Sequence, residues 1–170
     1  MGDVQLATVE SLVKEACHLA PGGGEAVWLV GDTYTLKVSG AQTGGAFTLL
    51  EAVVPPGGGP PPHVHHREDV TFVVLEGELV FRARDREVPS PPGSVLYIPK
   101  GTVHGFTNVG ATPARMLFLF TPAGMEGMFA EIGQPARAGL PAPPPSAEDV
   151  ARMLAVAPKY GFELLIPAEQ

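Results

Sequence analysis

Residues 57–77 read GGGPPPHVHHREDVTFVVLEG, and residues 93–108 read GSVLYIPKGTVHGFTN. Each segment places histidine next to a short apolar run that is bounded by Gly or Pro. Runs of Val, Thr, Phe, Tyr and Leu between such turn residues are typical of β-strands. Both segments therefore predict strands that carry histidines at or near their ends.

His63 and His65 are separated by one residue. Side chains at positions i and i+2 of an extended chain point to the same face, so both imidazoles can reach one point. A bound metal ion needs such convergence, because its nitrogen ligands lie ~2.0–2.1 Å away. The pair is also compatible with a solvated histidine cluster in a loop, and by itself it leaves both readings open.

The rest of the chain predicts an all-β fold with helical ends. Many short strands separated by turn residues are typical of a sandwich or barrel, and helical spacing predicts helices over 8–19, 125–132 and, after an N-cap at Ser146, 147–157. We expect an N-terminal segment (1–24), a β-barrel (25–122) and a C-terminal helical extension with a Pro/Ala-rich linker (123–170). The expected strands are 26–30, 33–39, 46–54, 70–75, 78–84, 94–98, 103–107 and 114–121.

The two histidine segments resemble the two signature motifs of the cupin superfamily. The second follows the pattern G(x)5PxG(x)2H(x)3N, and the first follows G(x)5HxH and closes with a glycine turn. The matching residues are Gly57, His63, His65, Gly77, Gly93, Pro99, Gly101, His104 and Asn108. The flanking sequence is similar to single-domain bacterial cupins called quercetin 2,3-dioxygenase-like. This resemblance implies a small antiparallel β-barrel, the double-stranded β-helix or jelly roll, with a metal inside.

The resemblance implies His63, His65 and His104 as metal ligands. A cupin normally adds a carboxylate, but the corresponding position here is Val70. Either three histidines hold a divalent transition metal (Fe, Ni, Zn, Mn or Cu), or the metal site is vestigial.

The acidic residues Glu68 and Asp69 lie next to position 70. A shift of one residue reverses the face of a strand, so they could coordinate only through a bulge. We otherwise expect them in solvent or paired with Arg67. His66 follows His65 directly and is expected at the surface.

Three functions are considered for these residues. One is a dioxygenase-type oxidoreductase acting on a small aromatic or enolisable substrate through the three-His site. The alternative is a non-catalytic cupin that binds a small molecule. A third is an isomerase of sugars or a lyase of acids, because cupins host many reactions and a fold does not fix a function. The sequence assigns no catalytic residue, and it predicts a pocket lined by Val70, Phe72, Phe81, Tyr97, Phe106 and Phe118.

Length and charge limit the remaining possibilities. A chain of 170 residues predicts one domain. The formal charge of −7 and the lack of a basic patch argue against nucleic acid as a partner. The apolar runs are too short to span a membrane, and Met1–Gln5 predicts no signal peptide. The single cysteine, Cys17, fits the cytoplasm. The resemblance implies a homodimer. Few Asn residues and many loop prolines fit a thermophile or a GC-rich genome equally well.

Overall fold

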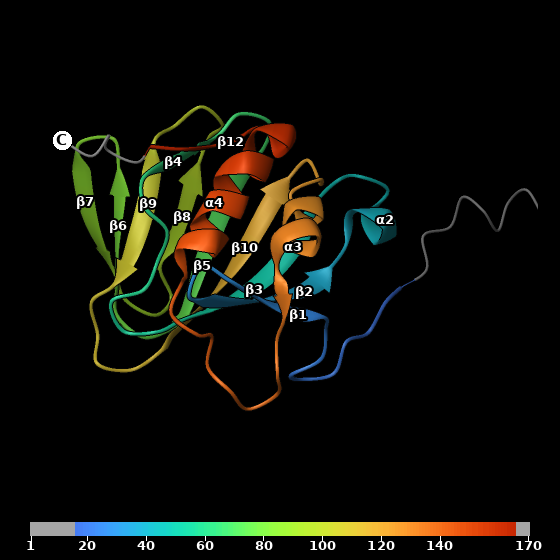
Figure 1. Ribbon diagram of the computed structural model, residues 1–170, viewed down its shortest axis with the longest axis horizontal. Coiled ribbons are helices and arrows are strands. Elements are labelled where there is room, and N and C mark those ends of the chain that lie inside the picture. The colour runs from blue at the N-terminus through green and yellow to red at the C-terminus, as the bar shows by residue number, and fades with distance from the viewer. Residues whose placement is uncertain (1–15, 166–170) are drawn as a thin grey trace, which may run out of the picture.

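The computed structural model describes residues 16–165, which form two antiparallel sheets that face each other (Figure 1). This confirms the all-β jelly-roll prediction. The seven-stranded sheet has the order β11-β1-β2-β3-β10-β5-β8. Its strands are β1 (Ala26–Leu29), β2 (Asp32–Val38), β3 (Thr48–Val54), β5 (Asp69–Glu76), β8 (Val95–Ile98), β10 (Ala114–Thr121) and β11 (Gln134–Pro135).

The five-stranded sheet carries the histidines and has the order β12-β4-β9-β6-β7. Its strands are β4 (His63–His65), β6 (Leu79–Ala83), β7 (Arg86–Ser90), β9 (His104–Asn108) and β12 (Phe162–Leu164). The eight strand ranges expected from the sequence each overlap an observed strand, whereas β4, β7, β11 and β12 lie outside those ranges.

The core lies between the two sheets. In β10 the residues Ala114, Met116, Phe118 and Phe120 are buried, and their neighbours are only partly buried, as period-2 alternation requires. Phe118 meets Phe72 of β5 at a ring-centroid distance of 4.8 Å in an edge-to-face contact. Such aromatic pairs contribute about 0.5–1.5 kcal/mol beyond the area they bury.

Helices cover one side of the barrel (Figure 1). They are the short α2 (Gly40–Thr43), α3 (Glu126–Ile132), α4 (Ala147–Val156) and a 3₁₀ helix (Ala157–Tyr160). Ser146 and Asp149 form the capping box of α4, with the serine side chain accepting from the Asp149 N–H, so the N-cap prediction is confirmed. The helix is too short to be stable alone, and it packs on this same chain through the buried Met153.

The C-terminal segment returns to both sheets, because β11 pairs with β1 and β12 pairs with β4. The domain boundaries given above stay a prediction. The helix expected over 8–19 lies mostly outside the described residues, and residues 16–19 are not helical.

Two motif glycines occupy left-handed backbone conformations, as their turn positions require. Gly77 has φ +87°, and a Cβ there would lie 2.6 Å from Ala114. Gly101 has φ +79°, and a Cβ there would meet open space. A side chain at position 77 would therefore meet both backbone strain and a steric clash, whereas a side chain at position 101 would meet backbone strain alone.

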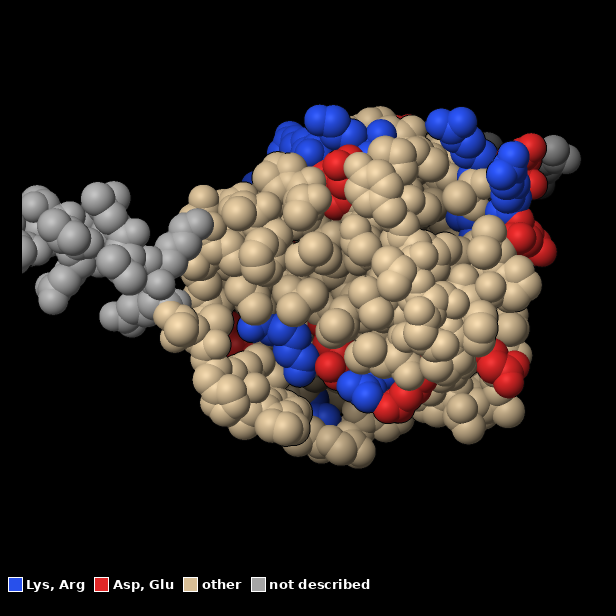
Figure 2. Space-filling model, turned by 180° about the vertical axis from the view of Figure 1, so that it is seen from behind, with Lys and Arg blue, Asp and Glu red and all other residues tan. Residues whose placement is uncertain are grey.

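Charged residues on the face drawn in Figure 2 mix both signs, so that face shows no continuous basic surface. Within residues 16–165, no helix is long and apolar enough to cross a membrane.

Candidate metal centre

Three imidazoles converge inside the barrel. His63 of β4 lies directly opposite His104 of β9 in the antiparallel ladder, and His65 is two residues further along β4. The ring centroids are 4.3 Å apart for His63 and His104, 5.2 Å for His63 and His65, and 5.6 Å for His65 and His104. One potential ligand atom from each residue lies within 4.8 Å of the other two. The structure therefore brings together the three histidines that the motifs singled out.

Backbone carbonyls fix the orientation of two of these rings. The Nδ1 atom of His63 is 2.9 Å from the Pro61 carbonyl oxygen, and the Nδ1 atom of His104 is 2.9 Å from that of Thr102. A carbonyl oxygen only accepts, so in both rings Nδ1–H donates and Nε2 keeps its lone pair when the ring is neutral. A metal-binding histidine usually donates a hydrogen bond in this way from the ring nitrogen that does not bind the metal.

The donor set fits a divalent transition metal. The Nε2 atom of His104 is fully buried and has no hydrogen-bond partner among the described residues. Burial lowers the pKa of all three imidazoles, to about 3 for His65, and their proximity lowers the pKa of His63 and His65 further. Neutral imidazole is the form that binds a metal, and three such ligands leave coordination positions open.

Glu68 lies inside the protein, which overturns the expectation that it faces solvent or pairs with Arg67. It is 4% exposed, and its Oε2 atom is 3.8 Å from Nδ1 of His65. The residue belongs to the turn between β4 and β5, so the alternation rule for strands does not apply to it. Burial raises its pKa, and Oε2 has no hydrogen-bond partner in the part of the chain that is described. Nδ1 of His65 is also buried without a hydrogen-bond partner among the described residues, so Glu68 lies beside this nitrogen without bonding to it.

The neighbours of Glu68 and His65 follow the expected directions. Asp69 points outward, where it accepts hydrogen bonds from the Tyr97 hydroxyl and the Lys100 N–H. His66 is exposed and forms an ion pair with Glu163 at 2.7 Å. Val70 is fully buried opposite Phe120, whose ring lies 5.4 Å from that of His65.

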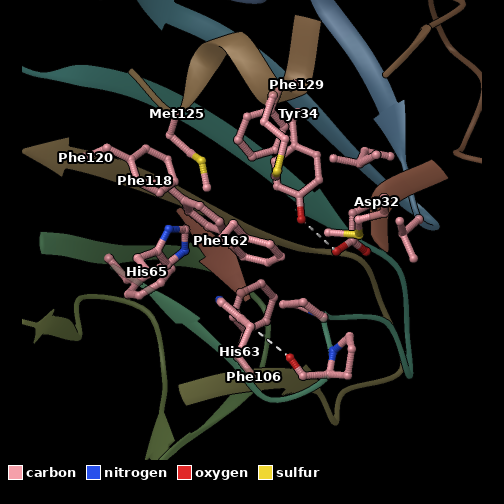
Figure 3. A pocket seen from close by; sticks show the side chains of 17 residues that line it. Asp32, Tyr34, His63, His65, Phe106, Phe118, Phe120, Met125, Phe129 and Phe162 are labelled. Atoms are coloured by element: carbon pink, nitrogen blue, oxygen red, sulfur yellow. Dashed lines mark hydrogen bonds between the residues drawn. The ribbon is translucent and has the colours of Figure 1, made fainter. Parts of the chain in front are cut away.

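An apolar cavity adjoins His63 and His65 (Figure 3). Of the six predicted lining residues, Phe72, Phe106 and Phe118 line it. Val70 and Phe81 are buried in the core around it. Tyr97 instead is 60% exposed, because it pairs with Thr71 on the outer face of the sheet.

The C-terminal segment supplies walls that the sequence motifs did not reveal. Phe162 of β12 packs against His63 and His65, at centroid distances of 4.9 and 5.0 Å. The other contributors are Met125, Met128 and Phe129 at α3 and Met153 of α4. Their helical spacing predicted buried faces, but no sequence signal indicated which part of the barrel those faces cover.

A second polar group lines the same cavity, and the motifs gave no indication of it. Asp32 begins β2 and is 2% exposed, and Tyr34 donates a hydrogen bond of 3.2 Å from its hydroxyl to Oδ2. Figure 3 shows Asp32 well away from His65, across the aromatic side chains. Burial raises the pKa of Asp32 to about 7, and the Tyr34 hydrogen bond offsets part of this rise.

Comparison with known protein families agrees with this geometry. Residues 50–120 match the family model described as a cupin domain. This match covers 71 of the 170 residues and includes all three histidines.

Among characterised proteins, the chain is similar to quercetin 2,3-dioxygenase of Bacillus subtilis, at 24% identity over 69% of this chain and 34% of the relative. It is 33% identical to the tetracenomycin polyketide synthase protein TcmJ of Streptomyces glaucescens, over 35% of this chain and 40% of that protein. The chain thus spans well under two thirds of these relatives.

Solved structures show the same fold. A predicted oxalate decarboxylase of Thermotoga maritima superposes with a TM-score of 0.58 at 21% identity, over 62% of this chain and 99% of that one. KdgF of Halomonas superposes with a TM-score of 0.58 at 16% identity, over 66% of this chain and 98% of that one. At these identities the likeness concerns the fold alone.

Proposed function

We propose that this protein is a metal-dependent cupin of the dioxygenase type, acting on a small aromatic or enolisable molecule. The observation that carries the proposal is the convergence of three buried, neutral imidazoles beside an apolar cavity. The similarity to quercetin 2,3-dioxygenase supports the class of reaction.

In this proposal His63, His65 and His104 hold one divalent transition metal. Such an ion would supply a Lewis-acidic centre with open positions for the oxygen atoms of a substrate. The Pro61 and Thr102 carbonyls hold two of the rings in the required tautomer. For the third ring, the proposal assigns the supporting role to Glu68, whose Oε2 atom lies 3.8 Å from Nδ1 of His65 and would have to move closer to bond to it.

The cavity walls select the substrate. Aromatic and methionine side chains line the cavity beside His63 and His65, so they favour a flat, largely apolar molecule. Phe162 covers both rings from the C-terminal strand. The buried Val70 offers no carboxylate at the motif position, so no base acts from there.

The alternative is a cupin that binds a small molecule without turnover. The valine at position 70 favours it, because the acid expected there is replaced by an apolar side chain. The homodimer, the cytoplasmic location and the thermophilic source stay predictions.

Metal analysis tests the first part of the proposal. Protein purified without a metal-affinity tag is expected to retain about one transition-metal ion per chain. His104→Ala is expected to lose that ion, whereas the matched control His66→Ala keeps it, because His66 is exposed and paired with Glu163. A wild type that retains no metal and whose melting is unchanged by added Fe(II), Ni(II), Zn(II) or Mn(II) would contradict the proposal.

Oxygen uptake with flavonols and β-diketones then separates the enzyme from the binder. The proposal predicts metal-dependent oxygen consumption with at least one member of the panel. Saturable binding without oxygen consumption by any metal-loaded form supports the alternative.

A further inference from the structure

The carboxyl group of Asp32 is an incomplete hydrogen-bonding group inside the cavity. Its Oδ2 atom accepts from Tyr34, but Oδ1 is buried and has no hydrogen-bond partner within residues 16–165. Leaving a buried acceptor unpaired costs about 1–3 kcal/mol, and more if it is charged. Asp32 is one of the residues that line the cavity, so a donor that enters the cavity would relieve this cost by bonding to the unpaired oxygen.

The surrounding backbone does not supply that donor. Gly58 lies against Asp32, since a Cβ at Gly58 would be 3.0 Å from Oδ1. However, the N–H of Gly58 already donates to the Pro55 carbonyl at 2.9 Å, and its carbonyl accepts from the Asn108 N–H at 3.0 Å. Gly58 thus lies close to Oδ1 without satisfying it.

The local structure fixes Asp32 in this position. It follows the two-residue turn Val30–Gly31, in which both residues have positive φ (49° and 89°), and it pairs with Leu29 across the hairpin. Leu29, Val30, Asp32 and Tyr34 all line the cavity. The hairpin therefore presents one acid on an otherwise apolar wall, away from the imidazoles (Figure 3).

We propose that Asp32 is a specificity-determining residue, whose Oδ1 accepts a hydrogen bond from a hydroxyl or ammonium group of the bound ligand. The inference rests on the proposed function, in which oxygen atoms of the same ligand meet the metal held by the three histidines. The ligand class is then a small aromatic molecule with two adjacent oxygens at one end and a hydrogen-bond donor at the other. A site built around a buried acceptor rejects analogues that lack the donor, because the acceptor is then desolvated without a partner.

Substituted catechols test this inference. The probes are catechol and its derivatives with a methyl, hydroxymethyl or aminomethyl group at position 4, together with their two-carbon homologues. Their dissociation constants are measured by calorimetry under argon, with zinc-loaded and zinc-free protein, because Zn(II) has no redox chemistry. The proteins are wild type, Asp32→Leu, Asp32→Asn and the control Asp69→Asn, which changes an acid that does not line the cavity.

In wild type and in Asp69→Asn, the hydroxyl or ammonium derivative is expected to bind about tenfold tighter than the matched alkyl derivative. Asp32→Leu reverses this order, since the wall becomes apolar. Asp32→Asn keeps the shape of the side chain and loses the preference for ammonium, so the comparison remains available if the leucine variant does not fold.

The outcomes separate this inference from the proposed function. Two results, each with zinc-dependent binding of catechols, would overturn the role of Asp32 alone. In one, wild type does not distinguish the matched derivatives; in the other, Asp32→Leu and Asp32→Asn leave the discrimination unchanged. Discrimination that needs Asp32 but is indifferent to zinc supports the role of Asp32 and contradicts the metal-dependent function. Failure of every catechol to bind, with or without zinc, overturns this ligand class and the role of Asp32, whereas the proposed function is decided by the metal analysis and the oxygen-uptake panel.

Discussion

Asp32→Asn should remove a pH-dependent loss of stability. Burial raises the pKa of Asp32 from 3.8 to about 7 in the folded protein. The folded state therefore favours the protonated acid. The contribution of Asp32 to the unfolding free energy is therefore fully present below pH 3.8, falls as the pH rises, and is lost above about pH 7.

The size of the effect follows from the two pKa values. One pKa unit corresponds to about 1.4 kcal/mol, so the ionised Asp32 costs the folded state about 4 kcal/mol above pH 7. The Asn variant does not titrate. Its stability relative to wild type should therefore rise by about 2–3 kcal/mol between pH 5 and pH 8. Tyr34, which is bonded to Asp32, has its own pKa raised well above 10 and stays neutral in this range.

Urea unfolding of chelator-treated wild type and Asp32→Asn at pH 5, 6, 7 and 8 measures this difference. The other titrating groups are common to both proteins and cancel in the comparison. A difference in unfolding free energy that stays constant from pH 5 to pH 8 would refute the reasoning, because it would mean that Asp32 ionises in the folded protein as it does in the unfolded chain.

Three further predictions concern two turn glycines, the buried acid Glu68 and the motif position occupied by Val70. Gly77→Ala should lower the unfolding free energy measured in urea titrations by about 2–4 kcal/mol, because the left-handed backbone is strained and the new Cβ clashes with Ala114. Gly101→Ala should lower it by only about 1–2 kcal/mol, because only the backbone strain applies there. Equal losses would contradict the steric argument. Glu68→Gln should weaken zinc binding about 10- to 100-fold in competition with a chromogenic chelator, whereas unchanged affinity would exclude support of His65 by Glu68. Val70→Glu should lower the melting temperature of the metal-free protein, since it buries an acid. Added metal should raise the melting temperature of this variant by more than it raises that of wild type. A variant that metal does not stabilise would show that position 70 does not face the site.

The barrel and the histidine convergence could be predicted because they depend on local pattern. Alternating strands and turn glycines specify the sheet, and the i, i+2 spacing directs His63 and His65 to one face. The approach of His104, by contrast, was inferred from the motif resemblance. The structure shows its cause as a direct pairing of His63 with His104 between β4 and β9.

The second polar group and the supporting acid could not be predicted, because their positions depend on tertiary packing. An Asp directly after Gly31 resembles an ordinary turn residue, and only the docking of the helical segment closes the cavity around it. Glu68 was expected to follow strand alternation, but β5 begins at Asp69, so the turn directs Glu68 inward. Similarly, Tyr97 was expected in the pocket, yet its pairing with Thr71 places it on the outer face of the sheet.

The most direct measurement is an anomalous difference map from a crystal of the metal-loaded protein. The account predicts one peak about 2.0–2.1 Å from a ring nitrogen of each of His63, His65 and His104. A map in which metal-loaded crystals show no peak at that point, or in which the three rings point apart, would contradict it.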